Sequence, residues 1–448
     1  MTTNPTTTPT TAAESLYAPS GLMARRNAAE RRFRAYGMAA IAFSLIVLAI
    51  MLFTIFRDGL SSFRQTAVTF PVTLTAEALA PKGTDDAEAM RKVTTIGYGK
   101  VIDASFLTFL ETAGLAVDGL SDKDARAILS KEAAGQLRAQ VLADPGLVGQ
   151  TIPMTLWTNA RIDGYFKGRV TMESAVRDGN VSPEQLQLAD LLATNGALSR
   201  PFNWQFLTGP DASDQRPEAA GLGISIIGSI YMMIIVAVLC VPIGVAASIY
   251  LEEFAPKNRW TDLIEVNISN LAAVPSIVYG ILGLAVFINF MNLPQSSSLV
   301  GGLVITLMIL PTIIIATRAA IRAVPPSIRD AALGIGASRM QTVFHHVLPL
   351  AMPGILTGSI LGLATALGET APLLLIGMVA FVDNYPALSA EGFLQPATAL
   401  PVQVYGWAQR SDPAFIERSS GAIIVLLVML VIMNAAAILL RRRFERRW

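Results

Sequence analysis

PPSIRDAALGIGASRMQTVFHHVLP, residues 325–349, is a polar stretch between two long apolar segments of the chain. Its two leading prolines end the preceding helix, because proline cannot continue a helix and disfavours helical backbone before it. Ser327 is expected to cap a short helix, and Ser338 a second one that runs to about residue 346. Gly334 and Gly336 between them allow a sharp turn. The pattern predicts either a compact knob that docks into a soluble partner or an amphipathic connector on a membrane surface.

Apolar segments dominate the rest of the chain. Hydrophobic residues make up 52% and charged residues 15% of the 448 residues, a balance too apolar for a soluble protein of this length. A run of about 20 apolar residues is long enough to cross a bilayer core of roughly 30 Å. Such runs cover residues 36–56, 221–250, 264–290, 299–317, 353–382 and 420–440. The sequence therefore predicts an all-α polytopic membrane protein with six transmembrane helices.

Basic residues are placed asymmetrically around these segments. They gather in RRNAAERRFR (25–34), in the loop 318–352 and in RRRFERR (441–447). Because Lys and Arg mark the cytoplasmic ends of membrane spans, both termini and the 318–352 loop are expected in the cytoplasm. The expected order is a disordered basic tail (1–35), the first transmembrane helix (36–56), an extracytoplasmic soluble domain (57–217), a five-helix core (218–440) that contains the loop 318–352, and a basic tail (441–448).

Residues 57–217 have the composition of a small mixed α/β domain inserted after the first helix. Ser121 with Asp124 predicts the start of a helical stretch toward residue 142, and Ser182 starts another helix that Gly196 closes. Residues 67–75 and 151–157 alternate as strands do. The domain has no histidine, cysteine or glycine-rich phosphate loop, so no catalytic group is predicted in it. In the whole chain, one cysteine and two adjacent histidines do not make a metal site.

Fixed points within residues 325–349 resemble a known motif. Asp330-Ala331-Ala332, Gly336 and Leu348-Pro349 have the spacing of the cytoplasmic loop by which permeases of ABC importers dock onto an ATPase. That loop reads Glu-Ala-Ala, three residues, Gly, nine residues, Ile, one residue, Leu-Pro. Asp330 keeps the carboxylate, whereas His346 stands where the family has an apolar Ile.

The resemblance extends to most of residues 221–440. It includes VPIGVAASIYLEEFAPKNR (241–259), NLAAVPSIVYGILGL (270–284), GILTGSILGLATALGETAPLL (354–374) and ALPVQVYGW (399–407). There the chain is similar to the PstA-type permease of phosphate importers. The resemblance implies the fold of a type I ABC-importer permease, with residues 57–217 as an extra domain that a subset of these permeases carries.

A permease of this family is a transporter subunit of the bacterial inner membrane with no cofactor and no catalysis of its own. The implied partners are a second permease subunit in a heterodimer, ATPase subunits, an extracytoplasmic phosphate-binding protein, phosphate and membrane lipid, without nucleic acid. The residues expected to couple to the ATPase are Ser327, Asp330, Ala331, Ala332, Gly334, Gly336, Leu348 and Pro349. The chain lacks the G-x-x-x-x-G-K-[ST] motif, so a separate chain would hydrolyse ATP.

Polar residues within the apolar segments are candidates for a transport path. Glu369 is expected near the middle of segment 353–382, where an ionised side chain costs on the order of 2.5–3.5 kcal/mol and by default marks function. It would accept a hydrogen bond from protonated phosphate or hold a cation; alternatively, it locks helices together. Arg318 would supply the cation, unless it reaches the membrane surface or a second permease supplies the charge. Thr365, Thr370, Asn270, Ser276 and Tyr279 would line the path or, as is commoner, hold helices together.

Other functions remain open on the sequence. A permease of this kind could carry another oxyanion, a peptide or another small solute. A membrane receptor could instead sense a ligand through residues 57–217. Deletion of that domain would distinguish the two functions, because a permease core could still transport whereas a sensor could no longer respond. An ion channel would conduct without an ATPase.

Overall fold

The computed structural model describes residues 21–79, 92–379 and 381–444. Residues 1–20 of the predicted tail and residues 445–448 lie outside this part of the chain. Two compact units are distinguished, residues 1–55 and residues 56–448. Helix α1 (Gly21–Gly59) runs through the first unit and contains the predicted span 36–56. It also includes residues 21–35, which the sequence assigns to a disordered tail, because a nucleated helix propagates readily through Ala, Arg and Glu.

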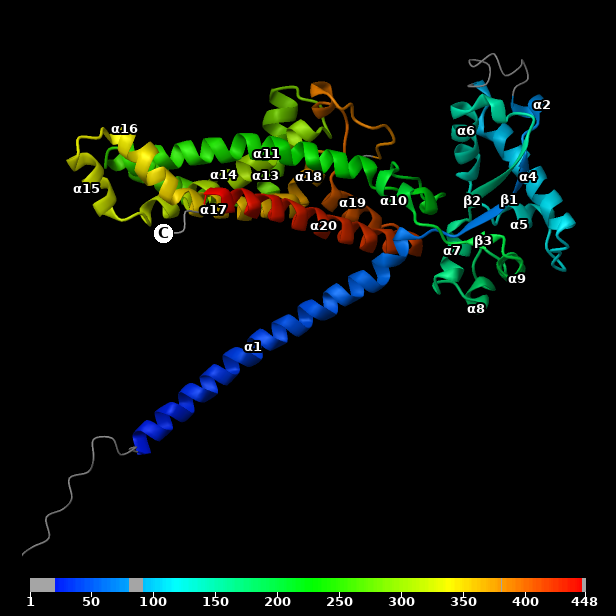
Figure 1. The fold of residues 1–448 in the computed structure, drawn as a ribbon, viewed down its shortest axis with the longest axis horizontal. Coiled ribbons are helices and arrows are strands. Elements are labelled where there is room, and N and C mark those ends of the chain that lie inside the picture. Colours follow the sequence, from blue (N-terminus) through cyan, green and yellow to red (C-terminus); the bar gives the residue numbers. More distant parts are fainter. Residues whose placement is uncertain (1–20, 80–91, 380, 445–448) are drawn as a thin grey trace, which may run out of the picture. The chain divides into compact units, whose positions relative to one another are not determined.

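The second unit contains the elements of the expected inserted domain (57–217), followed by the helices here called the core (Figure 1). The inserted domain contains a 3-10 turn (Leu60–Phe63), β1 (Ala67–Thr73), α2 (Ala76–Leu79), α4 (Thr95–Thr112), α5 (Asp122–Arg126), α6 (Ala133–Ala143), β2 (Thr151–Trp157), α7 (Ala160–Phe166), α8 (Met172–Ala175), α9 (Pro183–Thr194), β3 (Leu198–Ser199) and α10 (Trp204–Thr208). The core contains α11 (Gly223–Ile249), α12 (Arg259–Ala272), α13 (Ser276–Gly283), α14 (Ser298–Arg322), α15 (Pro326–Gly334), α16 (Arg339–Thr342), α17 (Leu348–Gly368), α18 (Ala371–Leu375), α19 (Leu400–Ala408) and α20 (Pro413–Phe444).

The inserted domain is mixed α/β, as its sequence predicts. Its three strands form an antiparallel sheet in the order β2-β1-β3, with Val68 opposite Leu156 and Phe70 opposite Met154. These inward side chains pack against helices α4, α6 and α9 in one hydrophobic core. The predicted helical stretch from Ser121 toward residue 142 is two helices, α5 and α6, because residues 127–132 leave the helix.

Local capping signals in the same domain are confirmed. The Ser121 hydroxyl accepts a hydrogen bond from the backbone N–H of Asp124. Ser182 and Gln185 form a reciprocal capping box at the start of α9. Gly196 follows that helix with φ +80°, a left-handed conformation that glycine adopts without steric cost.

Within the described residues, five helices are long and apolar enough to span a membrane, and a sixth span is added if one bent pair is counted. The bent pair is α12 with α13 and its π-helical extension, which meet at 101° where a continuous span 264–290 is predicted. Pro275 explains this break, because it cannot continue the preceding helix. The predicted span 353–382 is also interrupted, since α17 ends at Gly368 and only the short helix α18 follows.

Small residues let the core helices approach closely. A Cβ on Gly244 of α11 would lie 2.7 Å from Ile313 of α14, and one on Gly302 of α14 would lie 2.7 Å from Ile235 of α11. Gly358 of α17 meets α14 in the same way, at Ala316. Such glycine contacts are typical of helix packing in membranes, where close van der Waals contact replaces the hydrophobic effect as the driving force.

Candidate docking loop and transport path

The polar stretch 325–349 forms a turn of helices at one end of the core (Figure 1). Helix α15 is preceded by Pro325 as its N-cap, so the prediction that Ser327 caps it is wrong. Proline is favoured at the start of a helix because it has no backbone N–H to leave unpaired, and Pro326 takes the first helical position. Gly336 turns the chain with φ +93°. Ser338 then caps α16 through a reciprocal capping box with Gln341, as predicted.

The second helix of the turn does not end near residue 346. Helix α16 passes through a π-helical turn (Val343–Val347) directly into α17, and the apolar helix runs from Arg339 to Gly368. Leu348 and Pro349 therefore form the first turn of α17 rather than a separate connector.

One arginine fastens α15 to the core. Arg329 pairs with Glu253 at 2.8 Å, and it donates further hydrogen bonds to the carbonyls of Val324 at 2.7 Å and Ile321 at 3.0 Å. These contacts satisfy carbonyls at the end of α14, which its last turn leaves without intrahelical partners. The loop is thus held as a rigid knob on the core.

The knob has a buried and an exposed face. Ala332 is buried, and Val343 and Val347 pack with Ile321 and Ile249 beneath it. The exposed face is apolar around a carboxylate and comprises Asp330, Ala331, Leu333, Ile335, Met340 and Phe344. Ile335 is 83% exposed. An exposed apolar surface rimmed by polar groups is typical of a protein interaction site.

Glu369 lies at a break in the helix, not near the middle of a span. It is the first residue after α17 and has extended backbone, and α18 begins two residues later. Its side chain is partly buried, and no ion pair to it exists among the described residues. Thr370 directly precedes α18, whereas the exposed Thr365 donates to the carbonyl of Leu361. Non-helical backbone at membrane depth is tolerated only within protein or beside a water-filled cavity.

The two interrupted segments meet each other. A Cβ on Gly280 of α13 would lie 2.7 Å from the Cα of Pro372 in α18, so the two backbones are in close contact. The buried Tyr279 donates its hydroxyl proton to the carbonyl of Leu271 at 2.8 Å and so closes the break between α12 and α13. Tyr279 therefore acts as a link between helices. Asn270 is exposed and Ser276 is half-buried at the same break.

Arg318 is not a free cation. It is buried and pairs with Glu265 at 2.5 Å and with Glu252 at 3.3 Å. Arg322 contacts Glu252 at 2.7 Å. Sequence reasoning missed these acidic partners, although Glu252 and Glu253 lie in the quoted stretch 241–259 and face the arginines of the neighbouring loop. The two carboxylates thus balance the two positive charges of Arg318 and Arg322.

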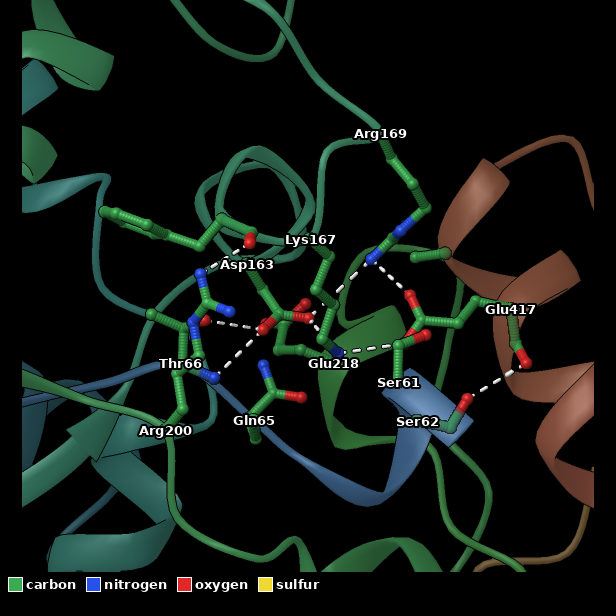
Figure 2. A network of polar contacts seen from close by, with 12 residues as sticks. Ser61, Ser62, Gln65, Thr66, Asp163, Lys167, Arg169, Arg200, Glu218 and Glu417 are labelled. Atoms are coloured by element: carbon green, nitrogen blue, oxygen red, sulfur yellow. Dashed lines mark hydrogen bonds and ion pairs between the residues drawn. The ribbon is translucent and has the colours of Figure 1, made fainter. Parts of the chain in front are cut away.

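A second polar cluster, which sequence reasoning also missed, joins the inserted domain to α20 (Figure 2). Lys167 contacts Asp163 at 2.7 Å and Glu417 at 2.9 Å, and Arg169 contacts Glu417 at 2.5 Å. The Asp163 carboxylate also accepts hydrogen bonds from the backbone and hydroxyl of Thr66. Buried charges persist in proteins when they are paired and hydrogen-bonded in this way.

The next residue of α20 continues this junction. The buried Arg418 donates to the carbonyls of Ala220 and Glu218 and to the side chain of Gln65. The Glu218 carboxylate accepts a hydrogen bond from Ser130 at 2.5 Å. Burial raises the pKa of the Glu218 carboxyl above its ordinary value, against the lowering effect of that hydrogen bond. The inserted domain is therefore seated on the core by buried polar contacts rather than tethered by a flexible linker.

A bundle of closely packed apolar helices with interrupted segments and a polar loop at one end is the architecture of a polytopic membrane protein. Residues 240–448, slightly less than half of the chain, match the family described as "Binding-protein-dependent transport system inner membrane component". Residues 21–176 match a "Domain of unknown function (DUF3333)". The chain is a multi-pass membrane protein with an additional N-terminal region before the part that matches the transport family.

Named relatives match the same region. The "Probable ABC transporter permease protein YqgI" of Bacillus subtilis is 36% identical over 190 residues, which are 42% of this chain and 62% of the relative. The "Phosphate transport system permease protein PstA 1" of Mycobacterium tuberculosis (H37Rv) is 30% identical over 187 residues, which are 42% of this chain and 58% of the relative. The chain thus covers less than two thirds of either relative. A solved chain of the MetNI methionine ABC transporter is 16% identical over 50% of this chain and 97% of its own length, with a TM-score of 0.38.

Proposed function

We propose that this chain is the membrane permease subunit of an ATP-driven phosphate importer. The observation that carries the proposal is the rigid knob at 325–349, which combines the Asp-Ala-Ala, Gly and Leu-Pro positions of an ATPase-docking loop with an exposed apolar face. Arg329 holds α15 against the end of α14. A push on the knob from a closing ATPase would therefore reach α14 and α17 without being absorbed by a flexible loop.

The proposed topology places both termini and the knob in the cytoplasm, and the inserted domain outside it. It is supported by the arginines at 25–34 and by those near the knob and at the end of α20. The domain boundaries 57–217 and 218–440 belong to this proposal. Phosphate as the cargo is supported by the printed name of the mycobacterial relative and by the GETAPLL segment.

The proposed path runs beside the two helix breaks. Glu369, freed from ion pairs among the described residues, would accept a hydrogen bond from a protonated phosphate oxygen, with Thr370 beside it. Because Arg318 is already paired with two carboxylates, we assign the phosphate-binding cation to a second permease subunit rather than to Arg318. The exposed apolar side chains of α12 and α13, among them Trp260, Leu263 and Ile281, support such a neighbour.

The test is uptake of labelled phosphate into proteoliposomes that contain this chain with its second permease, ATPase and phosphate-binding protein. Asp330→Lys should leave ATP hydrolysis running while phosphate uptake falls to background, because the lysine reverses the charge at the docking face. His346→Ile is the matched control in the same loop and should leave uptake intact. Normal coupling in the lysine variant would contradict the docking role.

The cargo and the path are tested in the same vesicles. Unlabelled phosphate should compete for uptake, whereas sulfate should not. Glu369→Gln should reduce uptake while ATP hydrolysis persists, because the amide no longer offers a purely accepting group. Competition by sulfate would assign another oxyanion as cargo, and unchanged uptake in the glutamine variant would remove Glu369 from the path.

A further inference from the structure

A small aromatic and apolar patch lies where the inserted domain meets the membrane core. Leu60, Phe202 and Trp204, here called the aromatic patch, are all exposed, and Trp204 is 67% exposed. The ring centroids of Phe202 and Trp204 are 4.7 Å apart, and Phe202 forms an isolated β-bridge with Arg64, close in sequence to Leu60. Phe202 and Trp204 therefore form one local surface, and the bridge brings the distant segment that contains Leu60 beside it.

The aromatic patch is level with the ends of membrane-spanning helices. Ser62, two residues after Leu60, donates a hydrogen bond to the carbonyl of Glu417 in the first turns of α20. A Cβ on Gly59 would lie 2.7 Å from the backbone of Ser420 and 2.8 Å from Ile424. Ile424 already belongs to the apolar part of α20, since the predicted apolar run starts at residue 420.

The chain around Trp204 leads to the same level. Leu222, the residue before α11, donates its backbone N–H to the carbonyl of Phe206 in α10. Phe63 links the patch to the core, since its ring centroid is 6.2 Å from that of Phe202 and 5.3 Å from that of the buried Phe206. The Phe206 centroid is in turn 6.3 Å from that of the core residue Trp407. Exposed on one side and joined to the core on the other, the aromatic patch is stiffly held at the depth where the spanning helices begin.

Aromatic side chains at this depth are typical of the membrane–water interface, where their rings lie among the lipid headgroups. Arg64, which faces Phe202 in the bridge, is exposed, and its guanidinium group can reach lipid phosphates while the rings lie deeper. Arg200 is instead held by the carbonyl and ring of Phe166. A patch that faced only water would gain nothing from this arrangement.

We propose that the aromatic patch inserts into the lipid interface of the leaflet on the side of the inserted domain. Leu60, Phe202 and Trp204 then enter the acyl boundary, and the domain leans on the bilayer with this face. This proposal does not depend on the transported solute. It predicts that equally exposed apolar residues elsewhere in the domain, Ile96 and Val176, remain in water, because they adjoin no spanning helix.

The experiment uses the full chain in proteoliposomes with Cys240, the single cysteine, replaced by alanine. Nitroxide labels are attached to cysteines at positions 202 and 204, and at 96 and 176 as controls. The ratio of collision rates with oxygen, which partitions into lipid, and with a water-soluble nickel chelate reports depth. The ratio should be several-fold higher at 202 and 204 than at both controls. Equal ratios, or exclusion of both reagents at 202 and 204 by a covering protein, would overturn the proposal.

A second measurement needs no cysteine. Brominated lipids quench tryptophan fluorescence on contact, so part of the emission of the otherwise unaltered protein should be quenched in brominated vesicles. Trp204→Phe should lower the quenched part of the emission, whereas Trp157→Phe, within the sheet of the inserted domain, should leave it unchanged. An unchanged quenched part in the Trp204 variant would show that Trp204 does not contact lipid.

Discussion

Replacement of Glu417 by glutamine tests whether the buried junction holds the inserted domain on the core. Glu417 is 5% exposed at its side chain and receives Lys167 at 2.9 Å and Arg169 at 2.5 Å. Glutamine keeps the shape of the Glu417 side chain but removes its charge. Lys167 and Arg169 then share one carboxylate, Asp163, at 2.7 Å and 3.7 Å. Removing one partner of a buried ion pair costs about 3–5 kcal/mol.

The remaining contact of Lys167 with Asp163 places the expected loss near the lower end, about 3 kcal/mol. This loss of stability is measured by pulse proteolysis of the purified protein in detergent at increasing guanidinium concentration. The readout is the release of the inserted domain. Glu111→Gln, at an exposed position in α4, is the matched control and should change the free energy of unfolding by less than about 0.5 kcal/mol.

A double-mutant cycle then isolates the contact itself. Lys167→Met alone should also destabilise the junction, since it leaves Asp163 and Glu417 facing mainly Arg169. The Lys167→Met and Glu417→Gln changes together should cost less than the sum of the two, with a coupling energy of about 0.5–3 kcal/mol for groups in direct contact. If Glu417→Gln behaves like the Glu111 control, the junction is held by its apolar contacts and the reasoning from buried charge is refuted.

Three further changes test other parts of the structure. Gly336→Ala should lower the free energy of unfolding by about 1–2 kcal/mol, because φ +93° is unfavourable for a residue with a Cβ. The control Gly334→Ala, at a position with open space and ordinary φ, should be neutral or stabilising. Equal effects of the two substitutions would contradict the conclusion that Gly336 is needed for the left-handed turn. Burial raises the pKa of the Glu218 carboxyl in the folded protein above its ordinary value of 4.5. The protonated carboxyl therefore stabilises the folded protein fully below pH 4.5, and this stabilisation is lost as the pH rises through the raised pKa. Glu218→Gln should flatten that part of the curve of melting temperature against pH, and an unchanged curve would remove Glu218 as its source. Tyr279→Phe should lower stability by about 0.5–1.5 kcal/mol through the lost hydrogen bond and leave the KM for phosphate uptake unchanged; a raised KM would instead place Tyr279 in the path.

Some features of the candidate site follow from sequence because their physical cause is local. Hydropathy marks α11, α14 and α20 within a few residues of their observed apolar parts. The caps at Ser182 and Ser338 depend on side chains three residues away, and both were predictable from that spacing. The same local rules wrongly assign the N-cap of α15 to Ser327. Both proline and serine favour the start of a helix, and in the structure the helix begins at the prolines, with Pro325 as the N-cap.

Other features needed contacts between distant segments. The prediction that Arg318 supplies a cation to the path fails once Glu252 and Glu265 are seen to pair with it. The hydropathy of the run 353–382 does not show that its helix ends at Gly368, because hydropathy reports affinity for lipid and not continuity of the backbone. Glu369 thereby moves from a span to a helix break, a setting where a polar group meets protein or water rather than lipid.

By itself, the sequence determined that this is a membrane protein with asymmetrically placed basic residues, an inserted α/β domain and a polar loop bearing the spacing of a docking motif. Those properties depend on composition and on neighbours a few residues apart. Only the tertiary structure decided which charges are free and which are paired, because Lys167 meets Glu417 across 250 residues of chain. The contact of Arg329 with Glu253, which holds α15 of the loop 325–349 on the core, likewise joins residues that are distant in the sequence.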